Sequence, residues 1–263
     1  MSKFLSLANV EKSFPIAGKE PYIAVENVNV EIKKNEIVSI IGHSGCGKST
    51  LLNMIAGLDL ATEGSLSLNF KEITGPGPDR AVVFQNHSLL PWLSVYQNIE
   101  MAVKKVMPEL DAKALRERVE KYIELVNLEP AKDKYPSEIS GGMKQRVGIA
   151  RALSINPEVL LMDEPFGALD SLTRASLQEH LMRIQQKEKN TVIIITHDVD
   201  EAVLLSDRVI MMTNGPQATI GEILEVNLEH PRDRVALQKN SEYIRCREAI
   251  LSFLYEKYTK DES

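Results

Sequence analysis

The chain has 263 residues, of which 31 are basic and 37 acidic, so its formal net charge is −6. This balance, with no run of basic residues, speaks against nucleic acid as a partner, and the length suits one large α/β domain or two small ones. Two cysteines, Cys46 and Cys246, are too few for a disulfide framework, so we expect buried or idle thiols in a reducing compartment. No apolar stretch approaches the roughly 20 residues of a membrane-spanning helix, and the first residues lack the pattern of a secretion signal, which predicts a cytoplasmic protein.

Two kinds of strand are predicted along the chain. Alternating apolar and polar residues over 4–7 and 25–32 indicate half-exposed antiparallel strands. The largely apolar, β-branched run at 37–41 and the continuous apolar runs at 159–162 and 192–195 are typical of strands buried on both faces, as in a parallel sheet covered by helices. The sequence therefore predicts an α/β fold.

Longer helical patterns lie between and after these strands. Residues 112–128 place apolar side chains at helical spacing with charges opposite, which predicts an amphipathic helix packed on the core. Residues 75–78 predict a loop and not a linker, because an apolar strand pattern resumes at 81–84. From about 232 to 258 we expect a charged helical tail whose apolar positions are only partly periodic, and hence an appendage.

The segment 42–50 has the spacing of a phosphate-binding loop. It matches G-x-x-x-x-G-K-[ST] between a predicted strand and a predicted helix, which is the context that the loop requires. Its glycines let backbone N–H groups converge on the β-phosphate, while Lys48 supplies a charge and Ser49 a hydroxyl ligand for Mg²⁺. We expect a nucleoside triphosphate to be bound by Gly42, His43, Ser44, Gly45, Cys46, Gly47, Lys48, Ser49 and Thr50.

Two side chains within this loop, His43 and Cys46, carry reactive groups. We expect both residues to be spacers that contribute only their backbone. Cys46 lies near a helix start, which can lower the pKa of a thiol. Inhibition by a thiol reagent would then come from steric blockage of the nucleotide and not from loss of a catalytic group.

Polar residues follow the two later buried strands. The run 159–162 ends in Asp163 and Glu164, where Asp163 can hold the Mg²⁺ hydration shell and Glu164 can polarise the attacking water. The run 192–195 is followed by His197, at a position where a γ-phosphate could be sensed. The carboxylate pair predicts hydrolysis of the nucleotide.

A second helix start able to accept an anion is predicted at Ser140, Gly141 and Gly142. Ser140 is a natural N-cap, and the two glycines open the helix start to close approach. Because the chain already has a phosphate-binding loop, this second start is redundant unless it serves the nucleotide of another subunit.

The order of these motifs resembles that of the ATP-binding subunits of ABC transporters. The motifs are the loop at 42–49, Gln85, Ser140 with its two glycines, Asp163–Glu164, the run 168–170 and His197. The resemblance implies a P-loop NTPase with a RecA-like parallel-sheet core, an antiparallel β subdomain and a helical subdomain inserted at about 86–157. It places the ATP-binding domain at residues 1–231 and a helical tail at 232–263.

The resemblance also implies roles for single residues and a partner. Phe14 would stack on adenine, with Tyr22 as the alternative, Gln85 would contact Mg²⁺ and the water, and Asp170 would link two sites. Two such subunits would stack head to tail, with each ATP held between the phosphate loop of one chain and the Ser140 signature of the other.

The chain departs from the family pattern on both sides of Ser140-Gly141-Gly142. The family has Leu and Gln where this chain has Ile139 and Met143. Ile for Leu is nearly neutral in apolar packing, whereas Met143 lacks a polar group that can approach the ribose, so the nucleotide is expected to be held more loosely there.

An apolar stretch follows Gln85 and holds the single tryptophan of the chain. The resemblance places residues 86–95 at the edge of a groove that receives a short helix of a transmembrane permease subunit. Leu89, Leu90 and Trp92 are the candidates for that contact, and burial within the helical subdomain is the alternative.

Several short sequence segments further narrow the resemblance to importers of small anions. Residues 75–80, 90–92, 211–216 and 230–234 are similar to those of nitrate, bicarbonate, cyanate, taurine and sulfonate importers. Residues 213–216 and 220–223 most resemble the cyanobacterial systems, with nitrate/nitrite as first choice and bicarbonate as second. This implies a second ATPase chain, permease subunits, an indirect role for a solute-binding protein, and a peripheral place on the cytoplasmic face of the plasma membrane. A soluble ABC ATPase acting on DNA or ribosomes and a P-loop kinase are the alternatives from other classes.

Overall fold

The computed structural model describes residues 4–86, 88–167 and 169–259. The chain divides into two compact units. Unit 1 consists of Met1–Pro76 together with Thr191–Ser263, and unit 2 consists of Gly77–Asn190. The first division therefore falls inside the 75–78 loop.

Unit 1 contains an antiparallel sheet of four strands. Strand β1 (Leu5–Phe14) pairs with β2 (Tyr22–Ile32) on one side and β4 (Glu63–Leu68) on the other, and β5 (Lys71–Glu72) follows at the edge. Buried and exposed residues alternate along the second half of β2, from Asn27 to Ile32. This confirms the half-exposed antiparallel strands predicted from the alternating pattern.

The second set of strands in unit 1 has a parallel, buried centre and an antiparallel edge strand. Strand β3 (Ile37–Ile41) lies between β8 (Thr191–Ile195) and β9 (Arg208–Met212) and runs parallel to both, while β10 (Ile220–Glu225) pairs antiparallel with β9. Every residue of β3 and β8 is buried. The continuous apolar runs thus form the centre of a sheet covered on both faces, as predicted.

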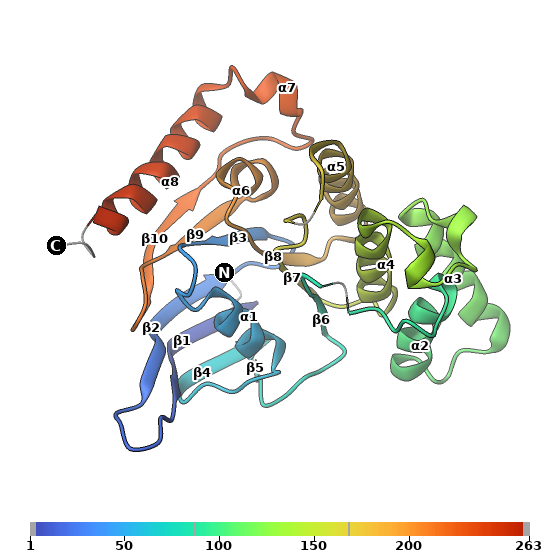
Figure 1. The fold of residues 1–263 in the computed structure, drawn as a ribbon, viewed down its shortest axis with the longest axis horizontal. Coiled ribbons are helices and arrows are strands. Elements are labelled where there is room, and N and C mark those ends of the chain that lie inside the picture. Colours follow the sequence, from blue (N-terminus) through green and yellow to red (C-terminus); the bar gives the residue numbers. More distant parts are fainter. Residues whose placement is uncertain (1–3, 87, 168, 260–263) are drawn as a thin grey trace. The chain divides into compact units, whose positions relative to one another are not determined.

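Two helices of unit 1 come directly after strands of this sheet, and two lie in the C-terminal part of the chain. They are α1 (Lys48–Ala56) after β3, α6 (Val199–Leu205) after β8, and then α7 (Arg234–Leu237) and α8 (Ser241–Thr259). Helix α8, red in Figure 1, lies alongside α6 and the β9–β10 hairpin.

The helical tail is part of the core of unit 1 and not an appendage. Tyr243, Cys246, Ile250 and Phe253 form one buried stripe of α8 at spacings of three and four residues. The ring of Phe253 packs against Gly221 of β10 so tightly that a Cβ atom there would lie 2.5 Å from the ring. Cys46 and Cys246 are both buried, as expected.

Arg232 is a buried charged residue that fastens the tail to α6. Its guanidinium donates hydrogen bonds to the carbonyls of Val203, Leu204 and Ser206 at the end of α6, at 2.8–3.1 Å, and to Leu228 O at 3.0 and 3.3 Å. These carbonyls are among those that a helix leaves without an internal partner at its end. Arg232 therefore acts as a C-terminal cap supplied from the tail.

We expect Arg232→Met to destabilise the protein by about 2–4 kcal/mol, because buried carbonyls lose their donors while the side-chain volume is kept. The midpoint of urea unfolding measures this loss. Arg245→Met is the matched control, since Arg245 forms a half-exposed ion pair with Glu242 on the same helix, and such pairs contribute about 1 kcal/mol or less. Equal losses in the two variants would contradict the capping role.

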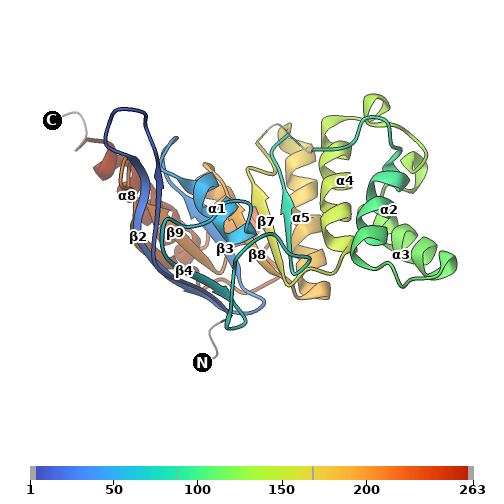
Figure 2. The same ribbon diagram turned by 90° about the horizontal axis from the view of Figure 1, so that it is seen from below.

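Unit 2 contains a pair of parallel strands and a layer of helices. Strand β6 (Arg80–Val83) pairs in parallel with β7 (Val159–Asp163). The helices α2 (Val95–Val106), α3 (Ala112–Leu125), α4 (Gly141–Ser154) and α5 (Ser171–Glu188) pack side by side (Figure 2), and two short 3₁₀ helices, η1 (Glu129–Ala131) and η2 (Pro136–Glu138), lead into α4.

Side-chain caps set the starts of the helices in unit 2. Ser94 and Gln97 form a reciprocal capping box at α2, and Asp111 caps α3. The apolar face of α3, with Leu115, Val119 and Ile123, is buried, which confirms the predicted amphipathic helix. None of the helices in the described part of the chain combines the length and apolar character that crossing a bilayer requires.

Candidate functional site

The phosphate-binding loop lies between β3 and α1 in unit 1. Its backbone is left-handed at Gly45 and Gly47, with φ of 81° and 83°. At Gly47 a Cβ atom would also lie 2.5 Å from Val25 Cγ1. Glycine is therefore required at position 47 both for the backbone conformation and for the approach of the loop to β2.

Lys48 opens α1 and folds back over the loop. Its Nζ donates to the carbonyls of Gly42 and His43, each at 2.7 Å, and the side chain is buried. No side chain caps the start of α1, and a helix start of this kind attracts anions because the aligned peptide dipoles leave positive charge there. The loop therefore has the cation and the backbone geometry that a triphosphate needs.

The side chain of Cys46 is buried as expected, whereas that of His43 makes a contact that was not expected. Cys46 is 1% exposed, and burial raises the pKa of its thiol despite the nearby Lys48 ammonium, so the lowering expected from the helix start is overcome by desolvation. The imidazole of His43 is more than a spacer, because its Nε2 donates to the carbonyl of Leu254 in α8 at 3.0 Å.

His197 is brought to the same edge of the sheet as the phosphate loop. Strands β3 and β8 run parallel, with Ile40 opposite Ile195, so the loop after β3 and the turn after β8 leave the same edge. His197 is exposed in this turn, and Asp198 caps α6 by accepting a hydrogen bond from Glu201 N at 3.0 Å.

The two candidate aromatic residues for adenine are neighbours. Phe14 ends β1 and is paired in register with Tyr22 at the start of β2, and the residues are 39% and 41% exposed. Lys12 Nζ lies 5.2 Å from the centre of the Phe14 ring. Both rings are partly exposed, with Lys12 over the ring of Phe14, and Phe14 stays the prediction for the stacking residue.

In unit 2 the structure brings Gln85 and Glu164 together. They follow the parallel strands β6 and β7, and Gln85 Nε2 donates to Glu164 Oε2 at 3.2 Å. Asp163 is the last residue of β7 and is half-buried. Glu164 has a left-handed backbone with φ of 45°, a conformation that a non-glycine residue holds at a cost and that is enriched at functional sites.

The Ser140 signature is a capped helix start with one open and one crowded glycine. Ser140 Oγ accepts from Met143 N at 3.3 Å, which confirms the N-cap of α4. A Cβ at Gly141 would meet nothing within 4 Å, whereas one at Gly142 would lie 2.5 Å from Thr173 Cγ2. Gly142 is thus needed where α4 passes α5, and Gly141 leaves room for a ligand.

Asp170 is the N-cap of α5. Its Oδ1 accepts from the N–H groups of Leu172 and Thr173 at 3.1 and 3.0 Å, and hydrogen bonds from Thr173 lower the pKa of the carboxyl. Thr173 thus touches Asp170 and the space above Gly142. The sequence analysis did not identify the contact between Asp170 and Thr173, although Thr173 stands at the N3 position of a helix that Asp170 caps, and that spacing could have indicated it. Ala168 of the same motif, and His87 after Gln85, lie outside the described residues.

The residues beside the signature and after Gln85 can also be placed. Ile139 is buried, in keeping with its expected role in apolar packing, and Met143 is half-buried. Trp92 is 68% exposed, which rules out its burial within the helical layer of unit 2, while Leu89 and Leu90 are half-buried.

Comparison with known proteins agrees with this arrangement. The family model described as "ABC transporter" matches residues 25–167. The chain is 58% identical over 261 residues to "Nitrate transport protein NasD" of Klebsiella oxytoca, with 99% of each chain covered, and 51% identical to "Nitrate import ATP-binding protein NrtD" of Synechococcus elongatus, with 98% of this chain and 94% of that one covered. It is also 54% identical to "Bicarbonate transport ATP-binding protein CmpC" of Synechococcus elongatus, over 97% of this chain and 38% of that longer one.

A solved structure has the same fold. The dimeric ATP-binding cassette MJ0796, bound to ADP and Pi, superimposes with a TM-score of 0.76 at 32% identity, covering 86% of this chain and all of that one. Together with a parallel sheet ending in a phosphate-binding loop and a separate antiparallel sheet, these similarities confirm the predicted P-loop fold and its chemistry. The chain belongs to the ABC transporter family and is the type of subunit that binds and hydrolyses ATP.

Proposed function

We propose that this subunit powers the uptake of a small anion, with nitrate or nitrite as the first candidate. The observation that carries the proposal is the pair of relatives named for nitrate, which match this chain over nearly their whole length at 58% and 51% identity. Bicarbonate is the second candidate, because CmpC is 54% identical over its matching part. Taurine and other sulfonates rank lower.

Within the proposed site, unit 1 binds the nucleotide. The backbone of residues 42–47 surrounds the β-phosphate, and Lys48 contacts the β- and γ-phosphates. Thr50 lies in the first turn of α1, beside the phosphates, and Phe14 stacks on adenine. The left-handed glycines and the buried Lys48 of the loop support this assignment.

Unit 2 supplies the hydrolytic groups. Glu164 accepts a proton from the attacking water, and Gln85, which donates a hydrogen bond to that carboxylate, orients it. His197, on unit 1, stabilises the γ-phosphate as negative charge develops.

Ser49, Gln85 and Asp163 are the proposed ligands of Mg²⁺. A hydroxyl, an amide oxygen and a carboxylate are the hard oxygen donors that this ion prefers, so the donor set fits. The ion, when bound, would neutralise charge on the phosphates. On the protein side, Asp163 is half-buried at the end of β7, where its carboxylate is held by a strand and not by a loop.

A second ATPase subunit completes the proposed site. Ser140, Gly141 and Gly142 form an open, capped helix start that would contact the ATP of the partner, and Asp170 would link the two sites. The dimeric arrangement of the related cassette MJ0796 supports this assembly. The partner is either a second copy or a homologous, longer chain.

Reconstitution tests the choice of solute. The subunit is purified with its native membrane partners, placed in proteoliposomes with the solute-binding protein, and assayed for ATP hydrolysis at rising nitrate, nitrite, bicarbonate or taurine concentrations. Stimulation by nitrate or nitrite alone supports the proposal, and stimulation by bicarbonate alone reverses the ranking. Retention by ribosomes or DNA, with no permease chain co-purified, contradicts an importer and supports a soluble ABC ATPase.

Trp92 is proposed to contact a transmembrane permease subunit, which places the protein peripherally on the cytoplasmic face of the plasma membrane. A tryptophan that is 68% exposed beside the half-buried Leu89 and Leu90 forms an apolar surface of the kind that marks interfaces. Closure of the ATPase pair would move this surface and drive the permease.

We expect Trp92→Ala to leave ATP binding unchanged and to reduce solute uptake per ATP hydrolysed at least tenfold, since interface tryptophans are often worth 2 kcal/mol or more. Uptake and phosphate release are measured together in the same proteoliposomes. Phe70→Ala is the control, because Phe70 is an exposed aromatic residue of unit 1 beside β5. Coupled uptake at the wild-type ratio in Trp92→Ala would contradict the contact.

A further inference from the structure

Helix α8 contacts the phosphate loop of unit 1 and also α6, the helix that follows the turn with His197. Near its C-terminal end, the carbonyl of Leu254 accepts the hydrogen bond from His43 in the phosphate loop at 3.0 Å. Near its start, Tyr243 and Arg247 reach Asp200 in α6, the helix that follows the His197 turn. The 12 residues from Tyr243 to Leu254 span about 16 Å along the helix axis, so one rigid element contacts both the phosphate loop and the first turn of α6.

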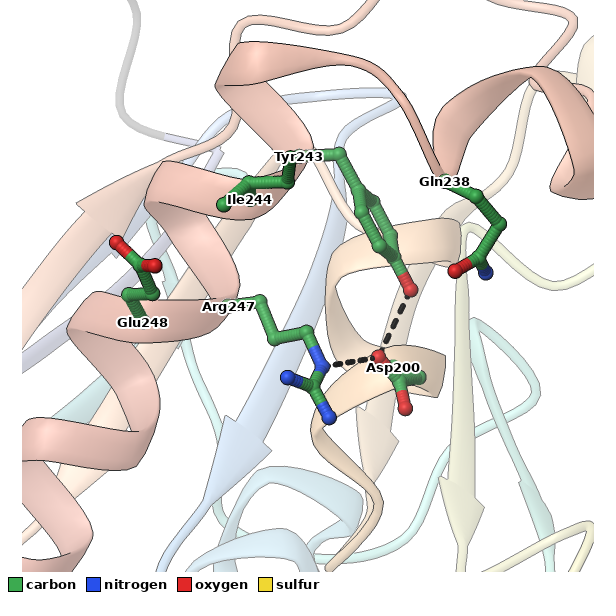
Figure 3. A pocket seen from close by; sticks show the side chains of 6 residues that line it. All are labelled: Asp200, Gln238, Tyr243, Ile244, Arg247 and Glu248. Atoms are coloured by element: carbon green, nitrogen blue, oxygen red, sulfur yellow. Dashed lines mark hydrogen bonds and ion pairs between the residues drawn. The ribbon is translucent and has the colours of Figure 1, made fainter.

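Asp200 is the meeting point between α8 and α6. Its Oδ1 accepts from Tyr243 OH and from Arg247 Nε, each at 2.8 Å, and Figure 3 shows both side chains pointing at this one oxygen beneath α8. They line a pocket of about 340 Å³ together with Gln238, Ile244 and Glu248. Burial and the neighbouring carboxylate raise the pKa of Tyr243, so its hydroxyl remains a donor.

The position of Asp200 is linked to that of His197 by a very short connection. Only residues 196–198 separate β8 from α6. Strand β8 is buried throughout, and Asp198 N donates to Thr196 Oγ1 at 3.1 Å, which tightens the turn. Because β8 is fixed in the sheet, the direction in which α6 leaves determines where the His197 backbone lies.

The other end of α6 is also held by the tail. Arg232 bonds the carbonyls of Val203, Leu204 and Ser206, as described above. A helix of seven residues is thus fastened at its start by α8 and at its end by the segment that precedes α7. Short helices have little stability of their own, so α6 takes its orientation from these contacts.

We propose that Tyr243 and Arg247 are positioning residues for ATP hydrolysis, which hold Asp200 and thereby the His197 turn in register with the phosphate loop that α8 contacts through His43. The inference rests on the proposed role of His197. It gives the C-terminal helix a part in catalysis that acts through the position of the His197 turn.

The test compares kcat and KM for ATP in the transport-competent complex. We expect Tyr243→Phe and Arg247→Gln each to lower kcat about three- to tenfold with KM within about twofold, because a displaced γ-phosphate contact slows the chemical step more than binding. Arg247→Lys keeps the charge and is expected to recover most of the rate. Amide hydrogen exchange over residues 197–202 is expected to become faster in Tyr243→Phe and Arg247→Gln.

Matched controls separate positioning from simple stability. Arg245 lies on the same helix and pairs with Glu242 within it, so Arg245→Gln breaks an ion pair of α8 without touching α6. It is expected to leave kcat and exchange at 197–202 unchanged. Asp200 is half-exposed, so loss of one partner leaves its carboxylate solvated, and Tyr243→Phe is expected to fold.

Three outcomes would overturn the inference. These are wild-type kcat and wild-type exchange in both Tyr243→Phe and Arg247→Gln, equal kcat losses in Arg245→Gln, and no recovery in Arg247→Lys. The variant His197→Ala separates the positioning role of Tyr243 and Arg247 from the proposed role of His197 itself. Full turnover in His197→Ala removes His197 from its proposed role, whereas slow turnover in His197→Ala with a normal Tyr243→Phe overturns only the positioning role.

Discussion

Glu164→Gln is expected to reduce the rate of ATP hydrolysis by about 10²- to 10⁴-fold, the range attributed to a general base. The amide has the shape of the carboxylate and can still accept the hydrogen bond that Gln85 Nε2 donates at 3.2 Å. The left-handed backbone at Glu164 also remains available to glutamine. Only the capacity to accept a proton from water is lost, so ATP affinity should stay within about twofold.

Phosphate release and equilibrium ATP binding measure the two quantities separately. Glu72→Gln, on the exposed edge strand β5, is the control and is expected to hydrolyse ATP at the wild-type rate. If Glu164→Gln lost ATP binding along with turnover, Glu164 would have a structural role and not that of the base. If it kept turnover, another group would have to activate the water.

Lys48→Ala is expected to act on ATP binding, the step before hydrolysis, and to weaken it about 10- to 100-fold. A hydrogen bond to a charged group contributes about 1.5–3 kcal/mol, and each 1.4 kcal/mol corresponds to a factor of ten in affinity. Lys48 is buried and holds the carbonyls of Gly42 and His43 at 2.7 Å. The substitution therefore removes both the charge and a support of the loop.

Fluorescent nucleotide titration measures the affinity, and the thermal midpoint without nucleotide shows whether the fold is kept. Lys105→Ala, exposed in the last turn of α2, is the control for loss of a lysine. Unchanged ATP affinity in a folded Lys48→Ala would show that residues 42–50 do not bind the phosphates.

Much of the fold was predictable because its signals are local. The runs 159–162 and 192–195 are apolar at every position, the run 37–41 is apolar except at Ser39, and the structure buries them as strands β3, β7 and β8. The phosphate loop was equally clear, since its glycine positions follow from backbone geometry within nine residues. Ser140 was predicted as an N-cap from its own residue type and its neighbours, and its hydrogen bond to Met143 N confirms this.

What the sequence did not indicate depends on contacts between distant segments. The tail was predicted to be an appendage because its apolar positions are only partly periodic, whereas its buried stripe also includes Tyr243 and Cys246. The bond from His43 to Leu254 joins residues 211 positions apart. The contact of Gly142 with Thr173 and the left-handed backbone at Glu164 are set by packing around them, and no local pattern reports such packing.

The burial of Cys46 has a consequence for chemical resistance. A thiol beside phosphates would ordinarily expose an ATPase to inactivation by peroxide or by electrophiles, since the deprotonated sulfur is the species that reacts. Here the sulfur is enclosed by its own loop and its pKa is raised, so it stays protonated and out of reach. Cys46 should therefore react slowly with peroxide or with thiol reagents while the loop keeps this conformation.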